Sequence, residues 1–361
     1  MAGLSNGVKM VLAMSDRTPN RVRDLLQAII TQYIVSGEPV GSSILAQKYI
    51  SDLSPATIRN TMSAMEDMGY LSKPHTSAGR VPTDMGFRFY IDSILEVREL
   101  SKAEREKIKE KYREASEIDA VMQDTSNILS SLSNCMGVVL APRFDNIFIK
   151  HIEFVRLSRT QIMVLIVSTS GIVQNRIVRI DDELKQHELE KMTGYLNEIA
   201  KGLTLRMLKH KIIEEMEEEK NLYDQLLKKA LVLSRIALDE TKQTDNIYIE
   251  GKTNILEQPE FVDDLEQMKL LFKAFEEKSV LVNILDKAMN ALGIQVSIGS
   301  ENGVGDIQGC SIITSPYSSN GNILGTLGVV GPVRMNYAKI IPLVSYTANL
   351  LSEIMTQRET I

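Results

Sequence analysis

The sequence predicts an α+β protein of several domains, and three observations lead to this class. The chain has 361 residues, which is more than one ordinary domain holds. Residues 18–97 read as three helices, a short strand–turn–strand segment and a fourth helix. Further along, strand-like runs lie on both sides of a charged helical block at residues 181–242. Helices that interrupt a series of strands indicate that one domain is inserted into another.

The composition limits where the protein can work. Hydrophobic residues make up 43% of the chain and charged residues 24%, which is the balance of a folded, soluble protein. No apolar run approaches the roughly 18–20 residues that are needed to cross a bilayer. The apolar stretch around Lys9 lacks the positive charge and the cleavage site of a secretory signal. We therefore expect residues 1–17 to be an N-terminal extension of a cytoplasmic protein that has no membrane partner.

Residues that could support catalysis are sparse. Cys135 and Cys310 stand in apolar surroundings, which favours buried thiols over a disulfide framework. None of the four histidines has a zinc-ligand spacing with cysteine. The sequence contains no phosphate-binding loop, no dinucleotide-binding glycine motif and no hydrolase nucleophile motif. It therefore predicts no enzyme, no metal site and no cofactor.

The helices of residues 18–97 have clear beginnings and ends. A capping threonine and a proline at 18–19 begin the first helix, and Gly37 ends it. A short second helix covers about 42–49. The third begins at the Ser54–Pro55 pair, again a cap followed by proline, and ends before a glycine at position 69. A fourth helix over 83–95 brings aromatic side chains to the same small core.

The third helix has an apolar and a polar face. Ile58, Met62 and Met65 recur at helical spacing, so they must face the core. Opposite them lie side chains of the types that recognise DNA: arginine pairs with guanine, asparagine with adenine, and serine or threonine with bases or phosphate. The alternative is an ordinary amphipathic helix with a solvated polar face. If the helix reads DNA, the base-reading residues are Ser54, Thr57, Arg59, Asn60 and Ser63.

The segment after the third helix predicts a two-stranded ribbon. Residues 70–72 read as a strand, residues 74–80 as a polar, turn-rich loop, and residues 81–82 as the returning strand. Three helices followed by such a ribbon make a winged helix-turn-helix, whereas a flexible surface loop is the alternative. As a wing, the ribbon would contact phosphates or the minor groove through Lys73, His75, Thr76, Ser77 and Arg80.

The charge of the chain supports DNA binding only locally. The net charge is −6, but affinity for nucleic acid depends on a positive face and not on the total. Residues 17–92 hold eight Lys and Arg against seven Asp and Glu, so their balance (8 − 7) is about +1. Residues 68–83 contain basic side chains and no acidic one. The positive charge is thus concentrated at the predicted ribbon.

One segment carries a family resemblance. Residues 54–92 read SPATIRNTMSAMEDMGYLSKPHTSAGRVPTDMGFRFYID, and the part PHTSAGRVPTD (74–84) is unusually specific. This segment closely resembles the signature of the HrcA family of bacterial heat-inducible transcription repressors. The resemblance implies a winged-helix domain (18–97), a GAF-like α/β domain and a helical inserted dimerisation domain. It also implies a homodimer on an inverted-repeat operator upstream of chaperone operons, with positive modulation by the GroE chaperonin.

The remaining chain fits that layout. A capping box at Ser101 and Glu104 predicts a long helix through Met122, so we expect residues 98–120 to be a solvated linker helix. The run at 161–169 is apolar on both faces, which predicts a central strand. Other strand-like runs cover 147–157, 173–180, 246–251, 294–299, 311–315 and 323–330. We assign residues 121–180 and 243–361 to the GAF-like domain, and residues 181–242 to the inserted dimerisation domain, with an apolar stripe at Leu222, Leu226, Leu227, Leu231 and Leu233.

Two functions remain open on the sequence. The first is a repressor that occupies promoter DNA as a two-fold dimer, without chemistry. The second is a metabolite-responsive regulator, because residues 323–332 and the helix after them resemble the end of a GAF fold and such domains often bind small ligands. No cyclic-nucleotide or chromophore motif is present, so we favour a scaffold role for this domain. An enzyme would require a cluster of perturbed titratable groups, which nothing in the sequence supplies.

Overall fold

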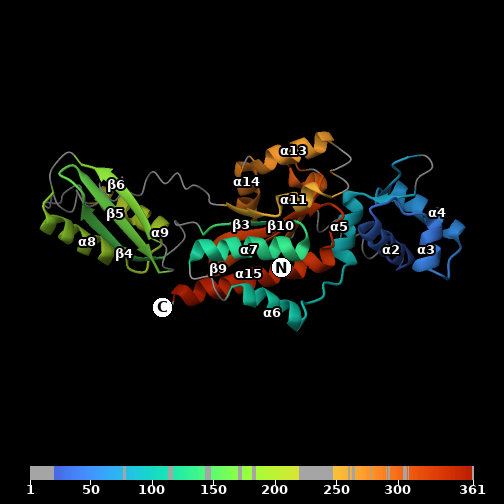
Figure 1. The fold of residues 1–361 in the computed structure, drawn as a ribbon, viewed down its shortest axis with the longest axis horizontal. Helices are drawn as coiled ribbons and strands as arrows, with labels where there is room; N and C mark the ends of the chain where they lie inside the picture. Colours follow the sequence, from blue (N-terminus) through green and yellow to red (C-terminus); the bar gives the residue numbers. More distant parts are fainter. Residues whose placement is uncertain are drawn as a thin grey trace.

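A computed structural model gives the fold of the chain. It describes residues 20–75, 79–112, 117–142, 148–169, 173–180, 184–218, 247–258, 261, 265–276, 278–289, 291, 293–303, 307 and 309–359. The described residues form three parts in a row (Figure 1). We call them the N-terminal unit (residues 20–95), the central unit, which is built on a five-stranded sheet, and the inserted unit (residues 148–218).

The N-terminal unit has the order of elements that the sequence predicts. Its helices are α2 (Asn20–Ser36), α3 (Ser42–Lys48), α4 (Pro55–Asp67) and α5 (Asp84–Ser93). Strands β1 (Leu71–Ser72) and β2 (Val81–Pro82) pair antiparallel between α4 and α5. The predicted caps are present: the Ser54 side chain accepts a hydrogen bond from the Thr57 backbone N–H, and Gly69 has a φ of +82° just after α4. Ile58, Met62 and Met65 are buried, as expected.

The expected linker helix is two helices packed on the central unit. Helix α6 (Lys102–Lys111) has the predicted capping box but ends at Tyr112, and α7 (Ile118–Ser133) begins anew. The Tyr112 hydroxyl lies 2.9 Å from the Thr125 Oγ1 atom of α7, and Ile108 is buried. The prediction of one long, solvated helix is therefore wrong, because these apolar and aromatic positions are used to dock α6.

The central unit is one antiparallel sheet between two layers of helices (Figure 1). Its strands are β3 (Met136–Leu140), β7 (Ile247–Glu250), β8 (Gln295–Ile298), β9 (Cys310–Ser319) and β10 (Asn322–Pro332), in the spatial order β7-β3-β10-β9-β8. Helices α7 and α15 (Tyr337–Glu359) cover one face, and α11 (Lys252–Leu256), α13 (Leu265–Glu276) and α14 (Lys278–Met289) the other. Strand β3, a five-residue run that is buried throughout, was not predicted from the sequence.

The inserted unit has its own sheet, which corrects the expected division of the chain. Strands β4 (Ile149–Arg156), β5 (Gln161–Ser168) and β6 (Val173–Arg179) pair only with one another among the described strands, with β5 in the middle. Helices α8 (Gln186–Ala200) and α9 (Leu205–Glu218) complete a separate hydrophobic core with them. Assigning residues 149–179 to the sheet of the central unit was wrong, because their inward side chains pack on α8 and α9.

The insertion leaves and re-enters the central sheet at neighbouring positions. Leu140, the last residue of β3, is the antiparallel partner of Ile247, the first residue of β7. The chain from 141 to 246 therefore takes the place of a hairpin turn. The leucine stripe at positions 222–233 lies outside the described residues.

Candidate DNA-binding surface

The outer face of α4 is exposed along its length. Ser54, Thr57, Arg59, Asn60 and Ser63 are all exposed, while the opposite face of the helix is buried. Helices α3 and α4 lie at the end of the molecule that is farthest from the inserted unit (Figure 1). The central unit therefore leaves this face open to a large ligand such as a DNA duplex.

The five predicted base-reading residues differ in how free their side chains are. The Ser54 and Thr57 hydroxyls lie 2.9 Å apart, and the Ser54 oxygen also accepts from the Thr57 backbone N–H at 3.2 Å. The Ser54 side chain thus caps α4, and the Thr57 hydroxyl is engaged with that cap. Within the described part of the chain, Arg59, Asn60 and Ser63 make no side-chain hydrogen bond or ion pair. Their polar groups are available to a ligand.

The ribbon residues also separate into two groups. Lys73 and His75 are exposed, and they make no side-chain hydrogen bond or ion pair with any described residue. Thr76 and Ser77 lie outside the described residues. The structure therefore places two of the predicted contacts, Lys73 and His75, on an open surface next to α4.

Arg80 occupies a different position from the one the sequence suggested. Its guanidinium forms an ion pair of 2.7 Å with Glu66 of α4, and its side chain is only 17% exposed. Its backbone N–H donates to the Val40 carbonyl and its carbonyl accepts from the Val40 N–H, both at 2.9 Å. At Gly79, a Cβ atom would lie 2.4 Å from the Val40 oxygen, so this close approach requires glycine. Arg80 fixes the base of the ribbon to α4, a role that no local pattern reveals because Glu66 is fourteen positions earlier.

This arrangement separates the roles of two basic residues. Arg80→Gln is expected to lower the free energy of unfolding by about 1 kcal/mol, since it removes a partly buried ion pair. The slope of log DNA affinity against log salt should be the same for Arg80→Gln as for the parent chain. Lys73→Gln should instead leave stability unchanged and reduce the slope of log affinity against log salt by about 0.9 for each phosphate that is no longer neutralised. Urea titrations and binding to random DNA over a salt series measure both; an equal loss of slope in the two variants would make Arg80 a phosphate-binding residue.

Cysteine thiols and metal-ligating side chains are the other groups of chemical interest in the described residues. Burial raises the pKa of the Cys135 thiol to about 11, so this thiol stays protonated at neutral pH. Cys310 is also buried and unbridged. In the described ranges, no three His, Cys, Asp or Glu side chains gather as a metal ion would require. None of the helices described is long and apolar enough to span a bilayer.

A surface hollow lies away from α4. It has a volume of about 450 Å³ and lies between α6 and α7. It is lined by Lys107, Ile108, Glu110, Lys111, Ile128, Ser131 and Leu132. The sheet of the central unit is instead packed on both faces by buried side chains, among them Tyr317, Tyr337, Phe261 and Phe275.

Comparison with known proteins gives a consistent set of relatives. The model of the HrcA protein C terminal domain matches residues 119–341. The heat-inducible transcription repressor HrcA of Geobacter sulfurreducens is 50% identical over 332 residues, or 92% of this chain and 96% of the relative. That of Syntrophobacter fumaroxidans is 42% identical over 346 residues, or 95% and 99%. A 2.2 Å crystal structure of a protein described as hypothetical aligns with a TM-score of 0.59 at 22% identity, covering 95% of this chain and 99% of that one, which is a likeness of fold.

Proposed function

The chain belongs to the HrcA family of heat-inducible transcription repressors, and from that premise we propose that it represses by occupying an inverted-repeat operator as a homodimer. A transcription repressor binds DNA and is not an enzyme. We propose that the N-terminal unit is the winged helix-turn-helix, with α4 as the recognition helix and the β1–β2 ribbon as the wing. The observation that carries this proposal is the exposed face of α4, on which Arg59 and Asn60 have no partner among the described side chains.

The proposal gives each element of the surface a task. Arg59, Asn60 and Ser63 read base edges, while Lys73 and His75 contact the sugar–phosphate backbone and fix the register. Ser54, which caps α4, and Thr57, whose hydroxyl contacts that of Ser54, are suited to a phosphate or base contact at the helix N-terminus. Thr76 and Ser77 extend the expected backbone contacts of the wing. A chain of this family acts in the cytoplasm on chaperone operons, with the GroE chaperonin as positive modulator.

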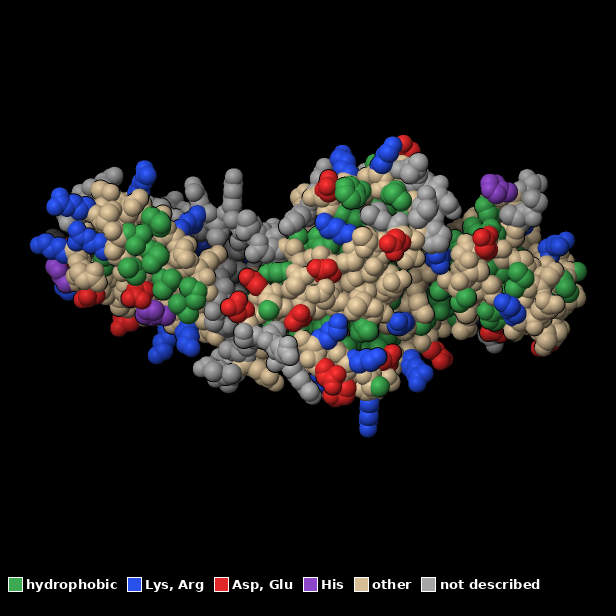
Figure 2. All heavy atoms as spheres, in the orientation of Figure 1, with side chains coloured by type: hydrophobic (Ala, Val, Ile, Leu, Met, Phe, Trp, Pro, Cys, Tyr) green, Lys and Arg blue, Asp and Glu red, His purple; other side chains and the backbone are tan. Residues whose placement is uncertain are grey.

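A dimer requires an interface between two copies of the chain, and the inserted unit offers one. Helix α8 packs against one side of the β4-β5-β6 sheet, and the other side bears an apolar row made by Val155, Met163 and Ile177 across the three strands. Val173 and Ile177 are 56% and 59% exposed. Hydrophobic side chains gather over this unit in Figure 2. A polar rim around an apolar centre is typical of protein–protein interfaces, so we propose that a second copy of the chain covers this side.

We assign the central unit a GAF-like scaffold role. Its sheet is filled on both faces by aliphatic and aromatic side chains in the described residues. The hollow between α6 and α7 lies on the outside of this packing. These observations favour repression without a small ligand over the metabolite-responsive alternative.

A binding assay tests the proposed function. The purified chain should bind an inverted-repeat duplex from upstream of a chaperone operon on the order of 10³ times more tightly than a scrambled duplex. Affinity for both should fall as salt rises, because phosphate contacts release counterions. Equal affinity for the two duplexes at every salt concentration would contradict sequence-specific repression.

A further inference from the structure

Helix α5 of the N-terminal unit is held by side-chain contacts to one corner of the central sheet. That corner comprises the end of β8 and the 3₁₀ helix η2 (Gly299–Asn302). The Asp84 carboxylate accepts hydrogen bonds from the Ser300 backbone N–H and the Ser300 hydroxyl, both at 2.9 Å. A Cβ atom at Gly299 would lie 2.3 Å from this carboxylate, so the approach is as close as a glycine allows. Both units therefore contribute to this contact: Asp84 from the N-terminal unit, and Gly299 and Ser300 from the central unit.

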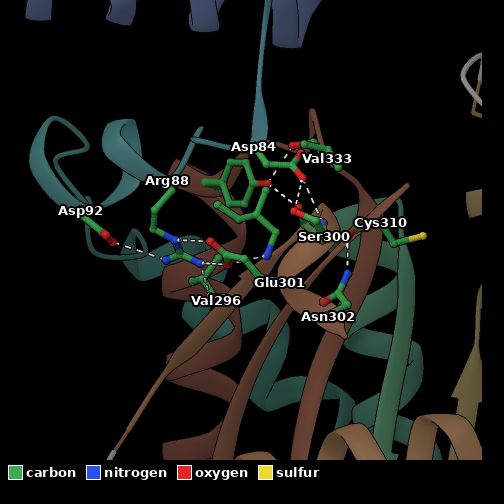
Figure 3. A network of polar contacts seen from close by, with 12 residues as sticks. Asp84, Arg88, Asp92, Val296, Ser300, Glu301, Asn302, Cys310 and Val333 are labelled. Atoms are coloured by element: carbon green, nitrogen blue, oxygen red, sulfur yellow. Dashed lines mark hydrogen bonds and ion pairs between the residues drawn. The ribbon is translucent and has the colours of Figure 1, made fainter. Parts of the chain in front are cut away.

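Arg88, one turn further along α5, makes the second contact (Figure 3). Its Nε donates to Glu301 at 2.9 Å, and a second guanidinium nitrogen bonds the other oxygen of the same carboxylate. That nitrogen also donates to the Val296 carbonyl at 2.6 Å, and the guanidinium pairs with Asp92 at 3.4 Å. A bidentate arginine–carboxylate pair fixes the relative orientation of the two side chains as well as their distance. We call the contacts of Asp84 and Arg88 with Ser300, Glu301 and Val296 the clasp.

Two further contacts join the N-terminal unit to the central unit. The Arg334 guanidinium donates to the Ile34 carbonyl near the C-terminal end of α2 at 3.2 Å. In addition, the rings of Phe87 and Tyr337 lie with centroids 5.9 Å apart. Because these contacts lie at separate points, the N-terminal unit has one defined orientation on the central unit.

The clasp lies behind the DNA-reading surface and not in it. Helix α5 stands between the central sheet and helices α3 and α4 (Figure 1). Asp84 and Arg88 point toward η2 (Figure 3), so DNA on the outer face of α4 would not touch them. An effect of these residues on DNA binding must therefore be transmitted through the orientation of the N-terminal unit.

We infer that Asp84 and Arg88 are positioning residues for operator binding, which set the separation and angle of the two α4 helices in the dimer. This inference rests on the proposed function, because orientation matters only when both halves of an inverted repeat are bound together. Simultaneous binding raises affinity strongly only if the geometry of the linked units matches the spacing of the sites. When the clasp contacts are removed, each α4 can still bind its half-site. The two α4 helices, however, no longer have the fixed separation that matches the spacing of the half-sites.

The experiment compares three kinds of duplex with the full-length chain and an Arg88→Met variant. The duplexes carry one half-site, the inverted repeat, and inverted repeats whose spacer is lengthened or shortened by a few base pairs. Arg88→Met should leave single half-site affinity within about twofold of the parent and weaken binding to the inverted repeat about tenfold. The ratio of its affinity for the natural spacer to its affinity for an altered spacer should be smaller than that of the parent. Glu301→Gln, which keeps the shape of the side chain, should show the same pattern more weakly.

Arg105→Met is the matched control. Arg105 pairs with Glu99 and lies over the Tyr346 ring, so its loss removes an arginine contact on the central unit but spares the clasp. It should bind every duplex like the parent. Equal losses on half-site and inverted repeat, or no loss on either, would overturn the positioning role. Failure of the parent chain to prefer the inverted repeat over scrambled DNA would instead overturn the proposed function itself.

Discussion

Replacing residues 141–246 by an Asn-Gly turn is expected to yield a folded monomer that binds the inverted repeat about 10²–10⁴ times more weakly than the parent. The change is conservative for the central unit because Leu140 and Ile247 are already antiparallel partners, which a two-residue turn can join. Each shortened chain keeps one α4 and can bind one half-site. The affinity that is lost is the avidity that two linked N-terminal units would provide. Sedimentation measures the oligomeric state, and binding to single and double sites measures the avidity.

A point variant tests the proposed dimer interface without a deletion. Ile177→Asp places a charge in the apolar row of the β4-β5-β6 sheet and should also give monomers. Met207→Asp is the control, because Met207 is 55% exposed on α9 of the same unit and outside that row. A deletion variant that dimerises as tightly as the parent would place the interface in the central or N-terminal unit. Removing only residues 181–242 is a poorer test, since it strips α8 and α9 from their sheet.

Asn60→Ala and Arg59→Ala are expected to cost about 1–3 kcal/mol per half-site on operator DNA, because each would remove a proposed contact to base edges. With two half-sites bound, the whole operator loses about 2–6 kcal/mol. Binding to scrambled DNA should change little for Asn60→Ala, which removes no charge. Both side chains are exposed, so the fold should be little affected.

The comparison of operator with scrambled DNA decides how these variants are interpreted. Lys73→Gln serves as the reference for a backbone contact, since it should weaken binding to both duplexes evenly. If Asn60→Ala gave that even pattern, α4 would not be the recognition helix. Circular dichroism of each variant confirms that a loss of binding is not a loss of fold.

The N-terminal unit could be predicted closely because its signals are local. The Ser54–Pro55 start of α4, the glycine at its end and the Thr83 cap of α5 each act within a few residues. The exposed face of α4 follows from the same helical period. The ion pair of Arg80 could not be predicted, because the fold must first bring the base of the ribbon next to Glu66 of α4.

The sheets could be predicted only in part because strand pairing is not local. The apolar pattern of β5 correctly indicated a middle strand, but not that its sheet is separate from the central one. Strand β3 pairs with β10 across about half the chain, and its short buried run resembles the end of a helix. The clasp could not be predicted from local sequence patterns either, since Arg88 and Glu301 are 213 positions apart.

The division of the hydrophobic cores has a consequence for how the molecule responds to heating. Buried side chains of the N-terminal unit and of the α7–α15 face belong to one continuous cluster, whereas the inserted unit holds a separate and smaller one. Segments with a shared core melt together, and a small independent core gives less stability. Calorimetry should therefore resolve the inserted unit as its own transition. If the inserted unit joins the two chains as proposed, warming that melts this unit first would separate two N-terminal units that are still folded. The promoter would then be released before either N-terminal unit unfolds.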